Sequence, residues 1–238
     1  TFFNYYSDSF QEPTADTGVW ISGFFGSGKS HFLKMLSYIL ENRSVEGVPT
    51  VERFRKKFED DPGTFMQVDR ATKGETETIL FNIDYEGSIN KDKTAVLRVF
   101  AKVFYNHLGF FGSNLKVAML EQYITQQGKM DEFCRLIEEK KGKPWTEVRK
   151  AFAFNGKFIK PALAEALDIS EEDASNWFND KRATELSVSQ LVEDINAYVS
   201  TKPANFRLLF MVDGAGQYVG TDTDMLLNLQ SLVEKIGS

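Results

Sequence analysis

The chain has a single cysteine, Cys134, so no disulfide can form within it. Histidine is almost as scarce. His31 and His107 lie far apart, and no other histidine or cysteine stands near either of them at the spacing of a metal-binding motif. A zinc site held by protein side chains is therefore not expected.

Long apolar runs are also missing. No stretch approaches the roughly eighteen apolar residues that cross a bilayer, and the first twenty residues lack the pattern of a signal peptide. The 28 bases are outnumbered by 34 acids, which gives a net charge of -6. We therefore expect a cytoplasmic protein with no membrane partner, and one that by itself is not a strong nonspecific DNA binder.

The most informative stretch, residues 23–30, reads GFFGSGKS and matches the phosphate-binding pattern G-x-x-x-x-G-K-[ST]. It follows a short apolar run at residues 19–21, which we interpret as a buried strand. An amphipathic helical pattern begins at His31 and continues to Leu40. Strand, loop and helix in this order form the context that the motif requires.

The chemistry of phosphate binding explains this pattern. Glycines let the backbone take positive φ and approach the phosphates closely, and a helix N-terminus adds N–H groups and a partial positive charge. Lys29 is expected to reach the β and γ phosphates of ATP, and the Ser30 hydroxyl to ligate Mg²⁺. The residues expected to bind the nucleotide are Gly23, Phe24, Phe25, Gly26, Ser27, Gly28, Lys29, Ser30 and His31. A glycine-rich turn that only joins a strand to a helix would not need Lys-Ser after its last glycine.

Two further apolar runs end in carboxylates. Leu208 to Val212 leads directly into Asp213, the arrangement that holds Mg²⁺ in P-loop NTPases, so we assign Asp213 and Ser30 to the metal. Residues 79–83 form another predicted buried strand, which ends at Asp84, Tyr85 and Glu86. Carboxylates at this edge of a parallel sheet are candidate site residues, although a solvated strand end is the other interpretation.

Between these strands, residues 94–201 have an almost wholly helical pattern, which indicates an inserted helical subdomain. Within it, Ser170 before Asp173 and Ser187 before Gln190 stand at the spacing of helix N-caps. We therefore predict an α/β P-loop NTPase fold: a parallel sheet flanked by helices, with a large helical insertion. The predicted parts are the first part of the core at 1–90, the insertion at 91–204 and the remainder of the core at 205–238. No sheet strand follows Ile236, so the chain is expected to be a fragment truncated at both ends.

One part of the insertion, residues 136–160, is rich in bases and aromatic side chains. Its seven bases are Lys140, Lys141, Lys143, Arg149, Lys150, Lys157 and Lys160, against three acids. The interleaved aromatics are Trp145, Phe152, Phe154 and Phe158. Such a surface can bind nucleic acid through phosphate contacts and stacking. The alternative is that the aromatics belong to the core and the lysines form a solvated face.

Residues 20–34 (WISGFFGSGKSHFLK), residues 212–220 (VDGAGQYVG) and residues 226–230 (LLNLQ) together resemble the amino-terminal ATPase region of the BrxC/PglY proteins of BREX bacteriophage-defence systems. This resemblance implies a large AAA+-like ATPase that uses ATP and Mg²⁺ and forms a homo-oligomer when full length. It also implies partners in a defence complex, namely a methyltransferase and a phosphatase-like protein, with DNA contacted through the complex.

The chain departs from this family at one position. The family has a glutamate directly after the metal-binding aspartate, where it orients the attacking water, and this chain has Gly214. Lys29, Asp213 and a carboxylate from elsewhere would then be catalytic, with Glu86 the best internal candidate. Alternatively, the chain binds ATP and hydrolyses it poorly, and a variant altered to trap the bound state would have the same pattern. A third possibility is a nucleic-acid-binding adaptor that uses the insertion.

Overall fold

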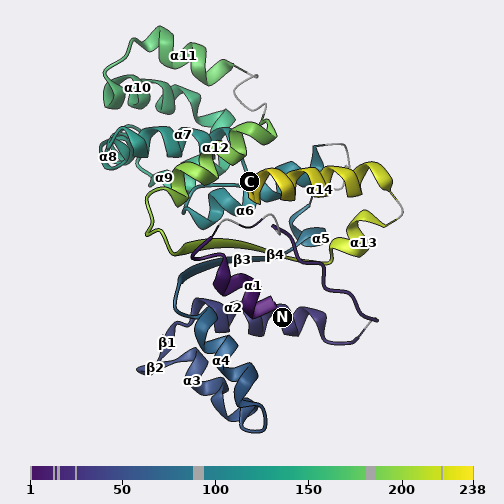
Figure 1. Ribbon diagram of the computed structural model, residues 1–238. Coiled ribbons are helices and arrows are strands. Elements are labelled where there is room, and N and C mark those ends of the chain that lie inside the picture. The colour runs from purple at the N-terminus through teal and green to yellow at the C-terminus, as the bar shows by residue number, and fades with distance from the viewer. Residues whose placement is uncertain are drawn as a thin grey trace. The chain divides into compact units, whose positions relative to one another are not determined.

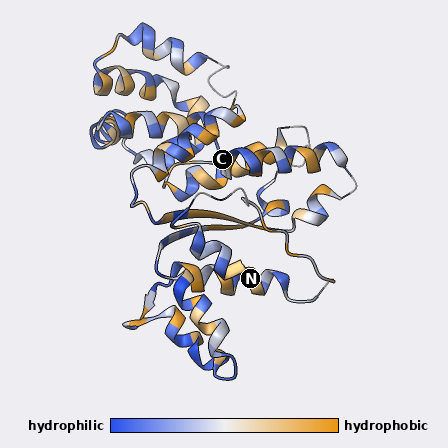
Figure 2. Cartoon of the chain, viewed as in Figure 1, coloured by the Kyte–Doolittle hydropathy of each residue, from blue (hydrophilic) through white to orange (hydrophobic). Residues whose placement is uncertain are grey.

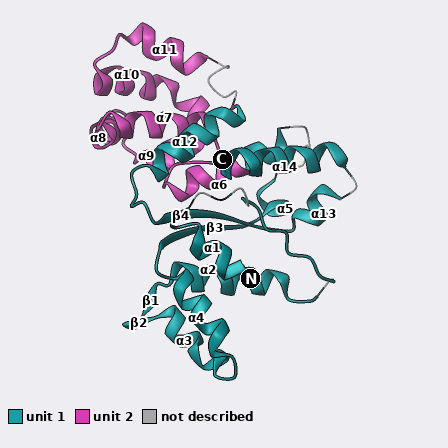
Figure 3. Cartoon of the chain, in the orientation of Figure 1, with its two compact units in different colours: residues 1–99, 187–238 teal, residues 100–186 magenta. Residues whose placement is uncertain are grey.

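The computed structural model shows a mixed α/β chain that is mostly helical and falls into two compact units (Figure 3). Unit 1 comprises residues 1–99 and 187–238, and unit 2 comprises residues 100–186. The structure describes residues 2–12, 14, 17–24, 26–87, 94–180, 186–220 and 222–237. Unit 2 lies inside the range 91–204 that the sequence assigns to the insertion.

Unit 1 is built on two parallel strands, β3 (Glu75–Asn82) and β4 (Phe206–Asp213). Their register pairs Glu75 with Phe206 at one end and Asn82 with Asp213 at the other. β4 is mostly hydrophobic (Figure 2), whereas the apolar residues of β3 are Ile79, Leu80 and Phe81 near its carboxyl end. This confirms strands near residues 79–83 and 208–212, but not their full burial, since Leu80 is exposed and most residues of 208–212 are half-buried. β3 also stops at Asn82, where the chain turns into a short helix.

Helices cover both faces of this sheet (Figure 1). On one face α2 (Lys29–Glu41) packs against both strands, and α1 (Phe2–Asp8) packs against α4 (Pro62–Ala71). On the other face α12 (Val188–Val199) packs against β4 and α14 (Thr223–Gly237). The remaining elements of unit 1 are the hairpin β1 (Ser44–Val45) and β2 (Val48–Pro49), α3 (Thr50–Phe54), η1 (Arg55–Phe58), α5 (Ile83–Glu86), the first turn of α6 (Ala95–His107) and α13 (Ala215–Val219).

The prediction of a buried strand at residues 19–21 is wrong. These residues carry no strand pairing, and the side chains of Val19 and Trp20 are 66% and 61% exposed. The segment instead runs past the C-terminal helices, where a Cβ on Gly18 would lie 3.0 Å from Val233. Short apolar runs favour extended backbone, but a strand also needs a neighbouring strand to accept its hydrogen bonds.

Unit 2 continues α6 and contains a stack of short helices with one apolar core (Figure 3). The helices are α7 (Leu115–Gln126), α8 (Met130–Lys141), α9 (Trp145–Val148), η2 (Arg149–Asn155), α10 (Gly156–Leu167) and α11 (Glu171–Asn179). Ser170 caps α11 by accepting from Asp173 N–H at 3.0 Å, and Ser187 caps α12 of unit 1 by accepting from Gln190 N–H at 3.1 Å. Both predicted caps are therefore confirmed. In the described part of the chain, no helix is long and apolar enough to cross a membrane.

A buried carboxylate organises the core of unit 2. The Glu121 side chain is 1% exposed and accepts hydrogen bonds from Trp145 Nε1 at 2.6 Å, Arg149 Nη1 at 2.8 Å and Phe111 N at 2.6 Å. Three donors from different segments thus converge on one charge. Such a network stabilises only while every partner is present, because a buried charge that loses its partner pays the full cost of desolvation.

Replacing this carboxylate tests the packing of unit 2. We expect Glu121→Ala to lower the free energy of unfolding by about 3–5 kcal/mol, because the Arg149 guanidinium and the Trp145 indole lose their acceptor. Urea denaturation followed by circular dichroism measures this change. Glu139→Ala is the control: it removes an exposed carboxylate that pairs with Arg135, and it should cost less than about 1 kcal/mol. Equal losses of unfolding free energy in the two variants would contradict the stabilising role assigned to Glu121.

Candidate functional site

The backbone of the glycine loop turns at two positions that require glycine. Gly26 has φ 77° and Gly28 has φ 87°, a conformation that L side chains rarely adopt. Apart from the residues next to each glycine in the chain, no described atom lies within 4 Å of a Cβ added to Gly26 or Gly28. The glycines are therefore needed for their backbone angles, and the space beside them is open to a ligand. Phe25, also expected to bind the nucleotide, lies outside the described residues.

Helix α2 begins directly after this turn. Its N-cap is Gly28, whose carbonyl accepts from Phe32 N–H at 2.8 Å, and no side chain caps the helix. The first N–H groups of α2 therefore have no acceptor from a capping side chain, and they carry the positive end of the helix dipole. Ser30 and His31 lie exposed in this first turn. The arrangement suits an anion, as the sequence predicts.

The Lys29 ammonium is bound by its own loop. Its Nζ donates to the carbonyl oxygens of Gly23 and Phe24, each at 2.9 Å. These contacts hold the two ends of the loop together. A phosphate that takes the lysine must replace two charge-assisted hydrogen bonds, each worth about 1.5–3 kcal/mol.

The start of α2 and the carboxyl ends of the strands lie at the same edge of the sheet (Figure 1). At the other end of the helix, Glu41 accepts from the backbone N–H of Thr78 at 2.9 Å, near the middle of β3. From there α2 extends about 18 Å towards its N-terminus, whereas β3 extends about 13 Å to its last residue. The loop therefore lies near the edge that carries Asp213. The Trp20 indole, just before the loop, lies 3.8 Å from where a Cβ on Gly216 would be.

Asp213 is the last residue of β4 and is partly buried. One of its carboxylate oxygens, Oδ1, accepts from the backbone N–H of Gly214 at 3.0 Å. Gly214 itself has φ 79° and caps the short helix α13. A glutamate at position 214 would need the same left-handed backbone, which costs a residue with a side chain about 1–2 kcal/mol.

The neighbouring strand brings a second carboxylate to this position. A Cβ on residue 214 would lie 3.5 Å from Asp84 Oδ2 and 3.3 Å from Asn82 Nδ2. Asn82 also fixes the start of α5, since its Oδ1 accepts from the N–H groups of Asp84 and Tyr85 at 3.0 and 3.2 Å. Asp84, in the turn that follows β3, thus brings a carboxylate close to the position that Gly214 leaves without a side chain.

Glu86, the carboxylate favoured by the sequence as a base, ends α5 and is half-buried. Its role stays a prediction, but the geometry around Gly214 favours Asp84. The sequence patterns do not identify Asn82 as a residue of the candidate site. The available signal was an amide that ends an apolar strand immediately before a helical turn, which is a capping position.

The residues at this edge provide oxygen ligands for a metal. The Ser30 hydroxyl and the carboxylates of Asp213 and Asp84 are the donors that Mg²⁺ prefers, and this ion commonly completes its shell with water and substrate phosphates. Among the described residues, no group of three or more His, Cys, Asp or Glu side chains is placed to hold a metal ion. A hydroxyl and carboxylates of this kind are the side chains that hold Mg²⁺ beside a nucleotide in P-loop proteins.

No protein-family model and no solved structure matches this chain. The assignment of the candidate site therefore rests on its residues and geometry alone.

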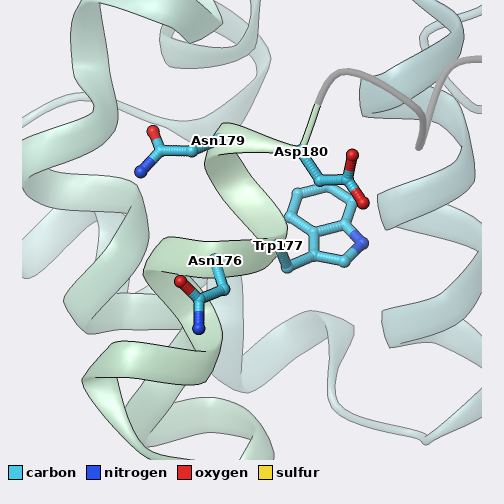
Figure 4. A pocket seen from close by; sticks show the side chains of 4 residues that line it. All are labelled: Asn176, Trp177, Asn179 and Asp180. Carbon is cyan, nitrogen blue, oxygen red and sulfur yellow. The ribbon is translucent and has the colours of Figure 1, made fainter.

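A separate hollow of about 430 Å³ lies at the end of α11 in unit 2. Its lining residues are labelled in Figure 4, where the Trp177 indole and the Asp180 carboxylate lie on one side of the helix and the amides of Asn176 and Asn179 on the other. Near the C-terminus of this helix, Lys116 Nζ donates hydrogen bonds to the carbonyl oxygens of Phe178 and Asp180 at 2.7 and 2.6 Å. Among the described residues, the lining of the hollow consists of two amides, a carboxylate and an indole.

The backbone at position 214 gives a direct test of the local geometry. We expect Gly214→Ala to lower the free energy of unfolding by about 1–2 kcal/mol, because alanine is strained at this φ. The added methyl also lies only 3.3 Å from Asn82 Nδ2. Gly216→Ala is the matched control in the helix that follows, where alanine should be neutral or stabilise by up to about 1 kcal/mol. Chemical denaturation measures the free energy of unfolding of both variants. An unchanged free energy in Gly214→Ala would refute the predicted strain at position 214.

Proposed function

We propose that this chain has a P-loop NTPase fold and binds ATP with Mg²⁺ at residues 23–30. The observation that carries this proposal is the glycine loop with two left-handed glycines that leads, without a side-chain cap, into helix α2. Backbone N–H groups in such a loop bind a polyphosphate, and the dipole of the helix adds to the attraction.

Each polar residue at this edge has a role in the proposal. Lys29 exchanges the carbonyls of Gly23 and Phe24 for the β and γ phosphates. Ser30 and Asp213 would hold Mg²⁺, which would supply positive charge to offset the negative charge that develops on the phosphates. His31 lies exposed beside Ser30, in reach of the same ligand.

Hydrolysis is proposed to be slow and to depend on Asp84. Gly214 supplies no carboxylate, but Asp84 Oδ2 lies 3.5 Å from where the Cβ of a residue at 214 would be. A carboxylate there can accept a hydrogen bond from the attacking water and orient it. The chain is thus primarily a nucleotide-binding module, with a weak ATPase activity as the second function.

The resemblance to BrxC/PglY proteins supports a biological setting for this module. In that setting, nucleotide binding drives the assembly or remodelling of a phage-defence complex in the cytoplasm. The partners would be further copies of the full-length protein, a methyltransferase and a phosphatase-like protein, with DNA contacted through the complex.

Calorimetric titration with ATP and Mg²⁺ tests binding. Lys29→Ala should weaken ATP affinity at least about tenfold, because the variant loses charge-assisted hydrogen bonds to the phosphates. Lys34→Ala is the matched control, since it removes an exposed lysine from the same helix and should leave affinity unchanged. Unchanged affinity in Lys29→Ala would refute the proposed nucleotide site.

Single-turnover phosphate release tests the assignment of the carboxylate. Asp84→Asn should retain ATP affinity within about threefold but release phosphate at least about tenfold more slowly, because an amide cannot accept a proton from water. Glu86→Gln, two residues further on in the same short helix, should keep the parent rate. The reverse pattern, with release lost only in Glu86→Gln, would return the role to the residue predicted from the sequence.

A further inference from the structure

The structure separates the bases at residues 140–160 of unit 2 into two groups. Three of the seven are engaged in ion pairs: Lys140 with Glu165 at 2.8 Å, Lys143 with Glu147 at 3.1 Å and Arg149 with the buried Glu121 at 2.8 Å. The other four bases form no ion pair with a carboxylate among the described residues, and they are Lys141, Lys150, Lys157 and Lys160. These four have positive charge available for a partner.

The aromatic side chains in this region divide in the same way. Trp145 and Phe152 are buried in the core of unit 2, as the alternative interpretation of the sequence expects. Phe158 is half-buried, and its ring lies between two ammonium groups: Lys141 Nζ at 4.6 Å and Lys157 Nζ at 4.8 Å from the ring centroid. Both distances are within the range of cation–π attraction.

Phe154 is the unusual residue of this group. Its side chain is 90% exposed, whereas a phenylalanine in a folded protein is normally buried. It lies in η2, one helical turn before Lys157. Lys150 lies exposed in the same element. An exposed aromatic ring with exposed lysines four residues before it and three residues after it is a combination that can stack on a nucleobase while the lysines contact phosphates.

We propose that Phe154, Phe158 and the four lysines 141, 150, 157 and 160 form a surface of unit 2 that binds single-stranded nucleic acid. A base stacks on Phe154, and the phosphates on either side lie over the lysines. A duplex is excluded from this stacking because its bases are already paired and stacked on one another. The net charge of -6 does not prevent binding, because charges elsewhere in the chain are screened beyond about 8 Å at physiological salt.

This surface is independent of the proposed nucleotide site, so the two can be tested in one set of variants. The full chain is titrated into a fluorescein-labelled oligothymidylate of about twenty nucleotides, and anisotropy is recorded at 50 and 200 mM salt. We expect binding that weakens with salt. Phe154→Ala should bind about tenfold more weakly with an unchanged salt dependence, because it removes stacking and no charge.

The double variant Lys150→Glu and Lys157→Glu should weaken binding further. It should also reduce the slope of log affinity against log salt by about 1.4, the value for two lost phosphate contacts on a single strand. Lys56→Glu with Lys57→Glu makes the same charge change at exposed positions of unit 1 and should leave oligonucleotide binding unchanged. Calorimetric ATP affinity should be the same in all of these variants.

Three results would overturn the proposal. The first is no binding of the oligothymidylate by the parent chain. The second is equal or tighter binding of a duplex of the same length, which would exclude stacking on Phe154. The third is equal weakening by the charge reversals in unit 1 and unit 2, which would show an effect of net charge alone. An acidic protein partner would give the first result. Since Phe154 is exposed, its replacement leaves the core intact, and circular dichroism checks that the variant is folded.

Discussion

The pairing of β3 with β4 is the constraint on which the candidate site depends. These strands are separated by more than a hundred residues of chain, and their register places Asn82 opposite Asp213. Because parallel strands end at the same edge, the turns that follow them meet there. A shift of the register by one residue would turn every side chain of one strand to the other face and would separate Asp84 from Gly214.

The sequence predicts well those features that depend on local chemistry. The amphipathic patterns give most helices, the capping serines at 170 and 187 are found as expected, and the glycines at 26 and 28 have the positive φ that a phosphate loop needs. It fails at residues 19–21, where an apolar run suggests a strand. Propensity there indicates an extended backbone, which the structure has, but not whether a partner strand accepts its hydrogen bonds.

The surroundings of Gly214 could not be predicted because they depend on register. The sequence shows that a carboxylate is missing after Asp213, and it offers Asp84 and Glu86 as two candidates from another strand. Choosing between them requires knowing where β3 stops. The strand ends at Asn82, whose amide caps the next turn, and this directs Asp84 towards position 214. No periodicity or spacing in the chain contains that information.

Gly214 and Asp84 are therefore best understood as a single arrangement. With φ 79° at residue 214, the chain turns sharply from β4 into α13, and a glutamate there would add strain to that turn. The space that its side chain would occupy is instead approached by Asn82 and Asp84 from the neighbouring strand. A carboxylate from another segment, that of Asp84, thus lies beside the position where the resemblance implies a glutamate. On this basis, the glycine is compatible with an intact site, and it should not be interpreted from the sequence alone as the loss of one.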